Sequence, residues 1–127
     1  MVGRRSLSLN KKEKQMYIEA TKKEVEDSLK KKDVVTILFF SLPTCSRCKF
    51  ILGVLGVGVK RLEELGLDNS RAKILKINCA EEFEIAKEYG VETVPTIVVC
   101  HGGETRKHSG KVDINGILKD IGEFLSE

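Results

Sequence analysis

The order of apolar and polar residues along this chain predicts its strands. β-Branched and aromatic residues fill positions 34–41, which is typical of a strand buried on both faces of a sheet. Shorter runs predict further strands at residues 72–78 and 96–100. The Gly102-Gly103 pair then predicts a tight hairpin, so another strand should return beside the one at 96–100.

Amphipathic stretches predict helices between and around these strands. A capping-box pattern from Asn10 to Glu13 begins the first helix, which places Ile18, Val25 and Leu29 on one face. Gly66 and Gly90 stand directly after the second and third predicted helices, where a glycine commonly ends a helix. The helices are expected from Asn10 to Lys31, from Thr44 or Cys45 to about Leu65, from Glu81 to Tyr89, and after a cap at Asp113.

The order of these elements predicts the topology. Strands that are joined through a helix should be parallel with right-handed crossovers, whereas the hairpin strands must be antiparallel. We therefore expect one α/β domain over residues 1–127, with a mixed central sheet of four or five strands and helices on both faces. Residues 1–9 are expected to be a loose arm, and residues 6–9 within it are the candidate fifth strand at the sheet edge.

Composition and charge are those of an ordinary soluble globular domain. The chain has 127 residues, of which 41% are hydrophobic and 32% charged. The longest nearly apolar stretch, residues 50–59, is too short to span a bilayer. The net charge is +3, and the basic excess lies in residues 1–33, which hold ten basic and six acidic side chains, against twelve and thirteen in residues 34–127. Without interleaved aromatic residues, the basic segment does not indicate nucleic-acid binding. No apolar segment follows Arg4-Arg5, so we expect a cytoplasmic protein.

The candidate chemistry lies directly after the strand at 34–41. Cys45 and Cys48 stand three residues apart at a predicted helix start, which places both thiols on one helix face within reach of each other. The unpaired amides of a helix N-terminus favour the thiolate, which is the species that attacks disulfides. We therefore predict a redox dithiol with Cys45 as the nucleophile. Arg47 between the cysteines either adds charge that stabilises the thiolate or extends into solvent.

Three segments of this chain resemble the thioredoxin family. They are Phe40–Lys49 with its CxxC pair, Tyr89–Thr96 with its Val-Pro-Thr sequence, and Gly102–Glu104 together with Gly110. The likeness extends from about Tyr17 to Leu125. It implies a thioredoxin fold with a cis bond at Val94-Pro95 facing the cysteine pair, and a substrate-binding surface at Thr44, Val94, Pro95 and Gly110.

The same resemblance implies a monomeric protein-disulfide reductase that needs no bound cofactor. Cys45 would attack a disulfide of a protein substrate, Cys48 would resolve the mixed disulfide, and a thioredoxin-reductase-like enzyme would recharge the pair. Two alternatives stay open. One is a glutaredoxin-like reductase that takes electrons from a low-molecular-weight thiol. The other is a thioredoxin-fold binding module whose CxxC is structural or holds a metal.

The chain departs from the family's pattern at three places of the site, one of which is the spacer Ser46-Arg47, where the family most often has Gly-Pro. Thr44 stands where the family usually has tryptophan before the first cysteine. Phe39 stands where a buried aspartate normally assists proton transfer to the second cysteine, although Lys76 matches a lysine often found near that aspartate. These departures leave the proton acceptor of Cys48 unassigned by the resemblance.

The remaining cysteines and histidines have less specific interpretations. Cys79 is expected near Cys45 as a small buried residue, with a third exchange thiol as the alternative, and Cys100 is expected in the core. Cys100 and His101 would complete a zinc ligand set with the other cysteines, but adjacent strand residues point to opposite faces. His108 is expected at the surface. Glycines between residues 53 and 58 indicate either close helix packing or a bend.

Overall fold

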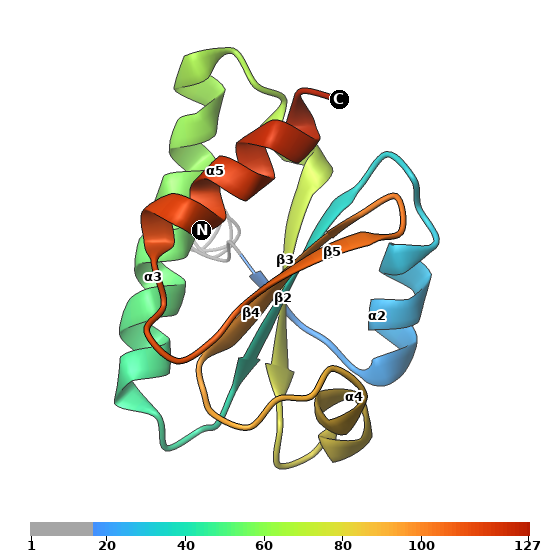
Figure 1. Ribbon diagram of the computed structural model, residues 1–127, viewed down its shortest axis with the longest axis vertical. Coiled ribbons are helices and arrows are strands. Elements are labelled where there is room, and N and C mark those ends of the chain that lie inside the picture. The colour runs from blue at the N-terminus through green and yellow to red at the C-terminus, as the bar shows by residue number, and fades with distance from the viewer. Residues whose placement is uncertain (1–16) are drawn as a thin grey trace, which may run out of the picture.

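The computed structural model describes residues 17–127, where five strands form one sheet in the order β1-β3-β2-β4-β5 (Figure 1). The expected arm over residues 1–9, its candidate strand at 6–9 and the capping box at Asn10 lie outside the described residues. The strands are β1 (Tyr17–Glu19), β2 (Val35–Ser41), β3 (Ala72–Asn78), β4 (Thr96–His101) and β5 (Glu104–His108).

The sheet is mixed, and its central strand is β2. β2 pairs in parallel with β3 and antiparallel with β4, while β5 returns antiparallel to β4 through the hairpin. All seven residues of β2 are buried, because helices cover both faces of the sheet there. Gly102 and Gly103 in the hairpin have φ of 56° and 88°, the left-handed region that glycine adopts without steric cost. The predicted α/β class and the predicted strands are confirmed.

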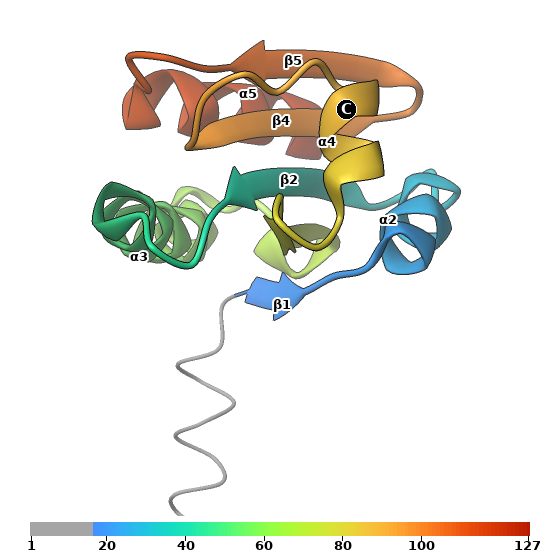
Figure 2. The same cartoon turned by 90° about the horizontal axis from the view of Figure 1, so that it is seen from below.

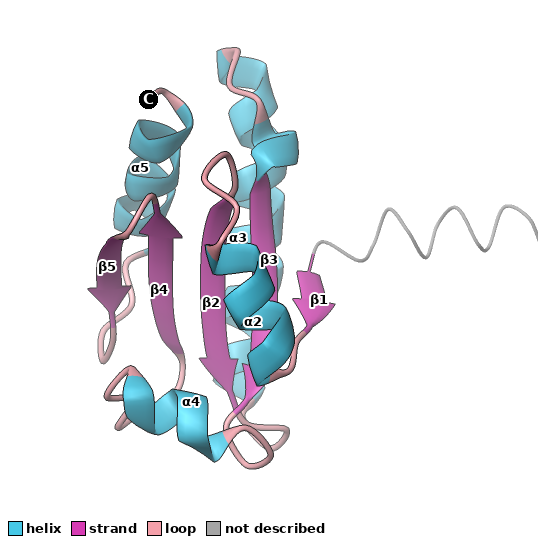
Figure 3. Cartoon of the chain, turned by 90° about the vertical axis from the view of Figure 1, so that its right-hand side faces the viewer, coloured by secondary structure: helices cyan, strands magenta, loops and turns pink. Residues whose placement is uncertain are grey.

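Helices cover the sheet from two sides. In Figure 1, α3 (Ser46–Arg61) and α5 (Ile114–Leu125) lie to the left of the sheet, and α2 (Lys22–Leu29) and α4 (Phe83–Glu88) lie to the right. Figure 3 shows α2 in front of the strands and α4 at the lower end of the sheet. Two short 3₁₀ helices follow α3, at Leu62–Leu65 and Asn69–Arg71. Within residues 17–127, no helix has both the length and the apolar character that crossing a membrane requires.

The first predicted helix begins too early in the chain. Residues Tyr17–Glu19 form β1, which pairs in parallel with the outer edge of β3, and the helix starts only at Lys22. Its start signal is local, because the Thr21 N–H donates a hydrogen bond of 2.8 Å to the Glu24 carboxylate in a second capping box. The pairing also covers backbone groups of β3 that would otherwise form an open edge. The sheet therefore gains its fifth strand, in addition to the four between residues 34 and 108, from Tyr17–Glu19.

The expected apolar face of that helix is correspondingly shorter. Val25 is fully buried, but Ile18 lies exposed in β1 and Leu29 is exposed at the end of α2. A strand has a side-chain period of two, so Ile18 no longer shares a face with residues of the following helix.

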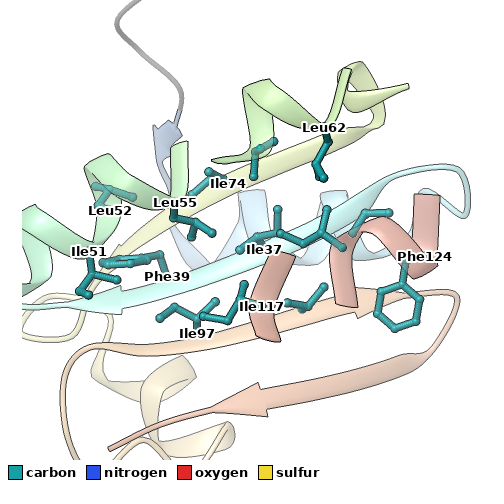
Figure 4. Packing of buried hydrophobic residues seen from close by; sticks show 14 of the residues in the cluster. Ile37, Phe39, Ile51, Leu52, Leu55, Leu62, Ile74, Ile97, Ile117 and Phe124 are labelled. Carbon is teal, nitrogen blue, oxygen red and sulfur yellow. The ribbon is translucent and has the colours of Figure 1, made fainter. Parts of the chain in front are cut away.

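Two apolar cores lie on opposite faces of the sheet. Successive side chains of a strand point to opposite faces, so Phe39 enters the core under α3 and α5, and Phe40 enters the core under α2 and α4. Figure 4 shows the first core, where Ile37 and Phe39 of β2 lie among Ile51, Leu52 and Leu55 of α3 and Ile117 and Phe124 of α5. This core continues to Cys48, so the candidate site rests on rigid packing.

One glycine in α3 has a clear packing reason. A Cβ atom at Gly58 would lie 2.6 Å from the Leu118 Cδ1 atom of α5, closer than two carbon atoms pack. Gly58 therefore allows α3 and α5 to approach each other. A Cβ atom at Gly53 would have nothing within 4 Å, so that position lacks such a reason. Of the two interpretations of this glycine-rich stretch, close packing applies at Gly58.

His108 is not the unpartnered surface residue that we expected. Its Nε2 atom lies 2.7 Å from Asp120 Oδ2, and the guanidinium of Arg106 donates to Asp120 Oδ1 at 2.9 Å. The side chains of all three residues are partly buried. Since Arg106 and His108 belong to β5 and Asp120 belongs to α5, these contacts join the edge strand to the C-terminal helix.

This cluster predicts a pH-dependent contribution to stability. Partial burial raises the pKa of Asp120, but hydrogen bonds from Arg106 and His108 outweigh it and hold that pKa below its ordinary value. Asp120→Asn should therefore lower the free energy of unfolding by about 1–2 kcal/mol at pH 7. The difference should persist down to about pH 4, the pKa of an unfolded aspartate, and disappear as pH falls through the lower folded pKa. Urea unfolding at pH 7 and at lower pH measures it, and an equal difference throughout would contradict the prediction.

Candidate active site

Cys45 caps the N-terminus of α3 with its own sulfur atom. The backbone leaves β2 through a turn in which the Cys45 N–H donates to the Leu42 carbonyl at 3.0 Å, with Pro43 at the second turn position. Cys45 itself is extended, with φ −89° and ψ 98°, and the Cys48 N–H donates to Cys45 Sγ at 3.1 Å. A hydrogen bond from a backbone amide stabilises a sulfur anion more than a neutral thiol, so this geometry favours the Cys45 thiolate.

The two cysteines form a disulfide, and their surroundings differ. Their Cα atoms are 5.2 Å apart, within the usual range for a disulfide. Cys45 is half-buried, whereas Cys48 is 2% exposed and packs in the core beneath α3. A substrate can therefore reach only the Cys45 sulfur directly. Cys48 is placed to attack Cys45 from inside the protein, which is the geometry that a resolving thiol needs.

The segment before β4 lies at the same end of the sheet as the cysteines. The Val94-Pro95 peptide is cis, Pro95 is buried, and Val94 packs half-buried against the core that contains Cys48. Thr96 Oγ1 donates to the Thr93 carbonyl at 2.7 Å and so holds the turn that leads into the strand. Figures 1 and 2 show the start of α3, this segment and the loop between β5 and α5 gathered at one end of the molecule.

Arg47 extends toward the loop between β5 and α5. Its Nη2 atom donates to the Gly110 carbonyl at 3.4 Å, a long hydrogen bond between two exposed residues. Gly110 has φ +70°, which a residue with a Cβ atom adopts only with strain. Thr44 is exposed in the turn before Cys45. The structure thus brings the predicted substrate-binding residues to one end of the sheet, and it places the Arg47 charge beside Gly110.

A small cavity lies beside the buried cysteine. It is lined by Phe39, Ser41, Leu42, Pro43, Cys48, Lys49, Leu52 and Lys76. No carboxylate is among these lining residues of the described chain, and Phe39 is fully buried where the family's aspartate was expected. Sequence reasoning missed Ser41, which is also buried here. The available signal was its hydroxyl, which stands two residues after Phe39 and therefore on the same face of an otherwise apolar strand.

The other two cysteines lie apart from the disulfide. Cys100 is buried in the core on the opposite face of the sheet, and burial raises the pKa of its thiol to about 11. Cys79 is half-buried against that same core, and burial raises the pKa of its thiol as well. A surface cavity of about 170 Å³ is lined by Cys79 together with Leu42 and Val94, so this thiol borders the candidate substrate surface.

The zinc ligand set weighed as an alternative in the sequence is not brought together. Over residues 17–127, the structure contains no group of three or more histidine, cysteine, aspartate or glutamate side chains that could hold a metal ion. Cys100 is separated from the Cys45–Cys48 pair by the sheet, since the two belong to cores on opposite faces. His101 contacts Glu127 instead, with Nδ1 and Oε1 at 3.2 Å.

Comparisons with known proteins agree with this geometry. The chain matches the thioredoxin family, described as "Thioredoxin", over residues 16–123. It is 29% identical over 92 residues to a thioredoxin of Rickettsia bellii, an alignment that covers 72% of this chain and 81% of the relative. It is also 29% identical over 111 residues to a thioredoxin of Chlorobaculum thiosulfatiphilum, covering 86% of this chain and 96% of that one.

The fold has close counterparts among solved structures. The oxidised mitochondrial thioredoxin 3 of Saccharomyces cerevisiae superposes with a TM-score of 0.69 at 22% identity, covering 84% of this chain and 94% of that one. Chloroplastic thioredoxin z gives a TM-score of 0.70 at 18% identity, with coverage of 87% and 96%. At these identities the likeness establishes the fold.

The fold and the helix-capping disulfide define a dithiol protein of the thioredoxin-fold class. With the family match over nearly the whole described chain, the protein belongs to the thioredoxin family. It is a thiol–disulfide oxidoreductase that acts on protein disulfides through the Cys45–Cys48 pair. The predicted family, fold and enzyme class are confirmed.

Proposed function

We propose that this protein works as a cytoplasmic, monomeric reductase of protein disulfides that a thioredoxin-reductase-like enzyme recharges. The observation that carries the proposal is the asymmetry of the disulfide, in which an accessible sulfur caps a helix and its partner is buried. Cys79 and Cys100 are free thiols, as is common for proteins of a reducing compartment.

The reaction is two successive thiol–disulfide exchanges. The Cys45 thiolate attacks one sulfur of the substrate disulfide, and the other sulfur leaves as a thiolate that takes up a proton. Cys48 then loses its proton and attacks Cys45 Sγ, which breaks the mixed disulfide and releases the second substrate thiol. Two electrons and two protons pass to the substrate, and the protein ends with the Cys45–Cys48 disulfide seen in the structure.

The surface around Cys45 suits an extended protein segment. Thr44 and Gly110 are exposed, and the half-buried Val94 precedes the cis-proline. An extended substrate chain that lies across Val94 would place its disulfide over the Cys45 sulfur, which the shallow setting of the site permits. The same surface leaves the reducing enzyme access to the Cys45–Cys48 disulfide.

The electron donor distinguishes the two reductase hypotheses. With insulin as the substrate, NADPH consumption should be rapid when thioredoxin reductase is the donor system and at least about tenfold slower with glutathione and glutathione reductase. The Cys45→Ser variant should reduce both rates to the background and serves as the control. Efficient turnover with glutathione alone would contradict the proposal and support the glutaredoxin-like alternative.

A further inference from the structure

The cavity beside Cys48 contains one polar group without a protein partner. Ser41 is 1% exposed, and among the residues that the structure describes its Oγ atom is the one buried side-chain nitrogen or oxygen without a hydrogen bond. Buried hydroxyls in folded proteins are nearly always paired, because an unpaired one loses its hydration without compensation. The Ser41 hydroxyl therefore calls for a partner that the surrounding side chains do not supply.

Strand geometry places this hydroxyl on the side of the sheet that carries the resolving cysteine. Phe39 belongs to the core under α3, and Ser41, two residues later in β2, faces the same way. Cys48 belongs to the same core. Lys76 is the pairing partner of Phe39 in β3, and it lines the same cavity as Ser41 and Cys48. A cysteine, a serine and a lysine thus line one small space, and the Lys76 ammonium itself lies 5.5 Å from the centre of the Tyr17 ring.

The cavity has the size of a single water molecule. About 20 Å³ of it is available to a water, and one water needs at least about 10–15 Å³ by the same measure. Most of its lining is apolar, and within it Ser41 and Cys48 offer hydrogen-bonding groups to a bound water. The exposed Lys49 and half-buried Lys76 mark the side on which the cavity approaches solvent.

We propose that Ser41 holds a water molecule in this cavity, and that this water accepts the Cys48 proton during resolution of the mixed disulfide. The proposal deepens the exchange cycle proposed above and rests on it. In the step itself, the S–H bond of Cys48 breaks, its proton moves to the water and then to solvent, and its electron pair forms the bond to Cys45 Sγ. The substrate sulfur leaves with the electrons of the broken mixed disulfide and takes up a proton from solvent.

The surrounding charges favour this direction of proton transfer. The charged residues that line the cavity are Lys49 and Lys76, so no lining carboxylate opposes the departure of the Cys48 proton. Ser41 acts as a positioning residue, because its hydroxyl orients the water. Ser41 thereby assists the removal of the Cys48 proton. Phe39 cannot do so, because its ring can neither bind a water strongly nor accept a proton.

The two exchange steps can be followed separately with an aromatic disulfide. Reduced protein in excess is mixed with 5,5′-dithiobis(2-nitrobenzoate) in a stopped-flow instrument. Attack by Cys45 releases one thionitrobenzoate, and attack by Cys48 on the mixed disulfide releases the second. In Ser41→Ala the first phase should be unchanged, and the second should slow by about tenfold at pH 7. That loss should shrink as pH rises, because Cys48 then ionises without the relay.

A matched variant controls for the loss of a buried hydroxyl. Ser28 is also buried, and its hydroxyl lies 2.7 Å from the hydroxyl of Thr36. Ser28→Ala should lower thermal stability and leave both kinetic phases unchanged. Ser41→Val, whose extra methyl groups fill the cavity, should slow the second phase at least as much as Ser41→Ala. A crystal structure of the wild type should show a water within hydrogen-bonding distance of Ser41 Oγ.

The outcomes separate this inference from the exchange cycle. A normal first phase with an unchanged second phase in Ser41→Ala would overturn the role of Ser41 and leave the cycle intact. A second phase slowed equally at every pH would also overturn it, because that result indicates a structural disturbance. Failure of the wild type to release even the first thionitrobenzoate would overturn the cycle and the inference together.

Discussion

Cys45→Ser should abolish the reduction of insulin disulfides by dithiothreitol-recharged protein, with a loss of at least about a thousandfold. A serine hydroxyl has no ionised form near neutral pH, whereas the Cys45 thiolate is stabilised by the helix N-terminus and by the Cys48 amide at 3.1 Å. Cys48→Ser should retain the first attack but trap the mixed disulfide, so that turnover falls at least about tenfold and relies on external thiol. Turbidity of the reduced insulin chains measures both losses.

The matched control is the half-buried thiol outside the disulfide. Cys79→Ala should keep insulin reduction within about twofold, since Cys79 lies outside the disulfide and burial raises the pKa of its thiol. Zinc and iron should be assayed on the same samples. Activity that survives Cys45→Ser, or stoichiometric metal that disappears with either active-site cysteine, would contradict the dithiol mechanism and favour a structural or metal-holding pair.

Phe39→Ala should produce the largest loss of stability, about 3–5 kcal/mol in the free energy of unfolding. The Phe39 side chain of the central strand is fully buried, with 0% solvent exposure, and packs beneath α3 beside Ile51 (Figure 4). Its removal deletes apolar contacts and leaves a cavity that the surrounding strands and helix cannot close. Urea unfolding followed by circular dichroism measures the change, and a fall in Tm of more than about 10 °C should accompany it.

Phe50 provides the matched control for Phe39, because it is the same residue type at an exposed site. It lies on α3 with 69% solvent exposure. Phe50→Ala should change the free energy of unfolding by no more than about 0.5 kcal/mol. Similar losses in both variants would show that burial under α3 does not carry the stability that we assign to it.

Local patterns in the sequence were enough to predict most elements of the fold. The β-branched run that forms β2, the Gly-Gly hairpin and the Asp113 cap of α5 each depend on neighbouring residues. The Asp113 carboxylate, for example, accepts the Asn115 N–H at 3.1 Å, as a helix cap should. The cysteine pair was predictable for the same reason, since its spacing and its place at a helix start are local properties.

Errors arose where a distant segment decides the local structure. Tyr17–Glu19 became a strand because the edge of β3 was available to pair with it, and that edge is more than fifty residues away in the chain. His108 gained Asp120 as a partner only through the packing of α5 on the sheet. Neither contact leaves a periodic signal in the sequence, so pattern reasoning could not find it.

The sequence by itself determined the fold class, the central strands and the dithiol at the start of α3, because hydrophobic periodicity, turn residues and cysteine spacing act over a few residues. Only the tertiary structure decided where the Arg47 side chain reaches, and that Ser41 and Lys76 line one cavity with Cys48. These properties depend on the distances between elements that are far apart in the chain. Those distances are set by the folding of the whole chain and leave no local pattern in the sequence.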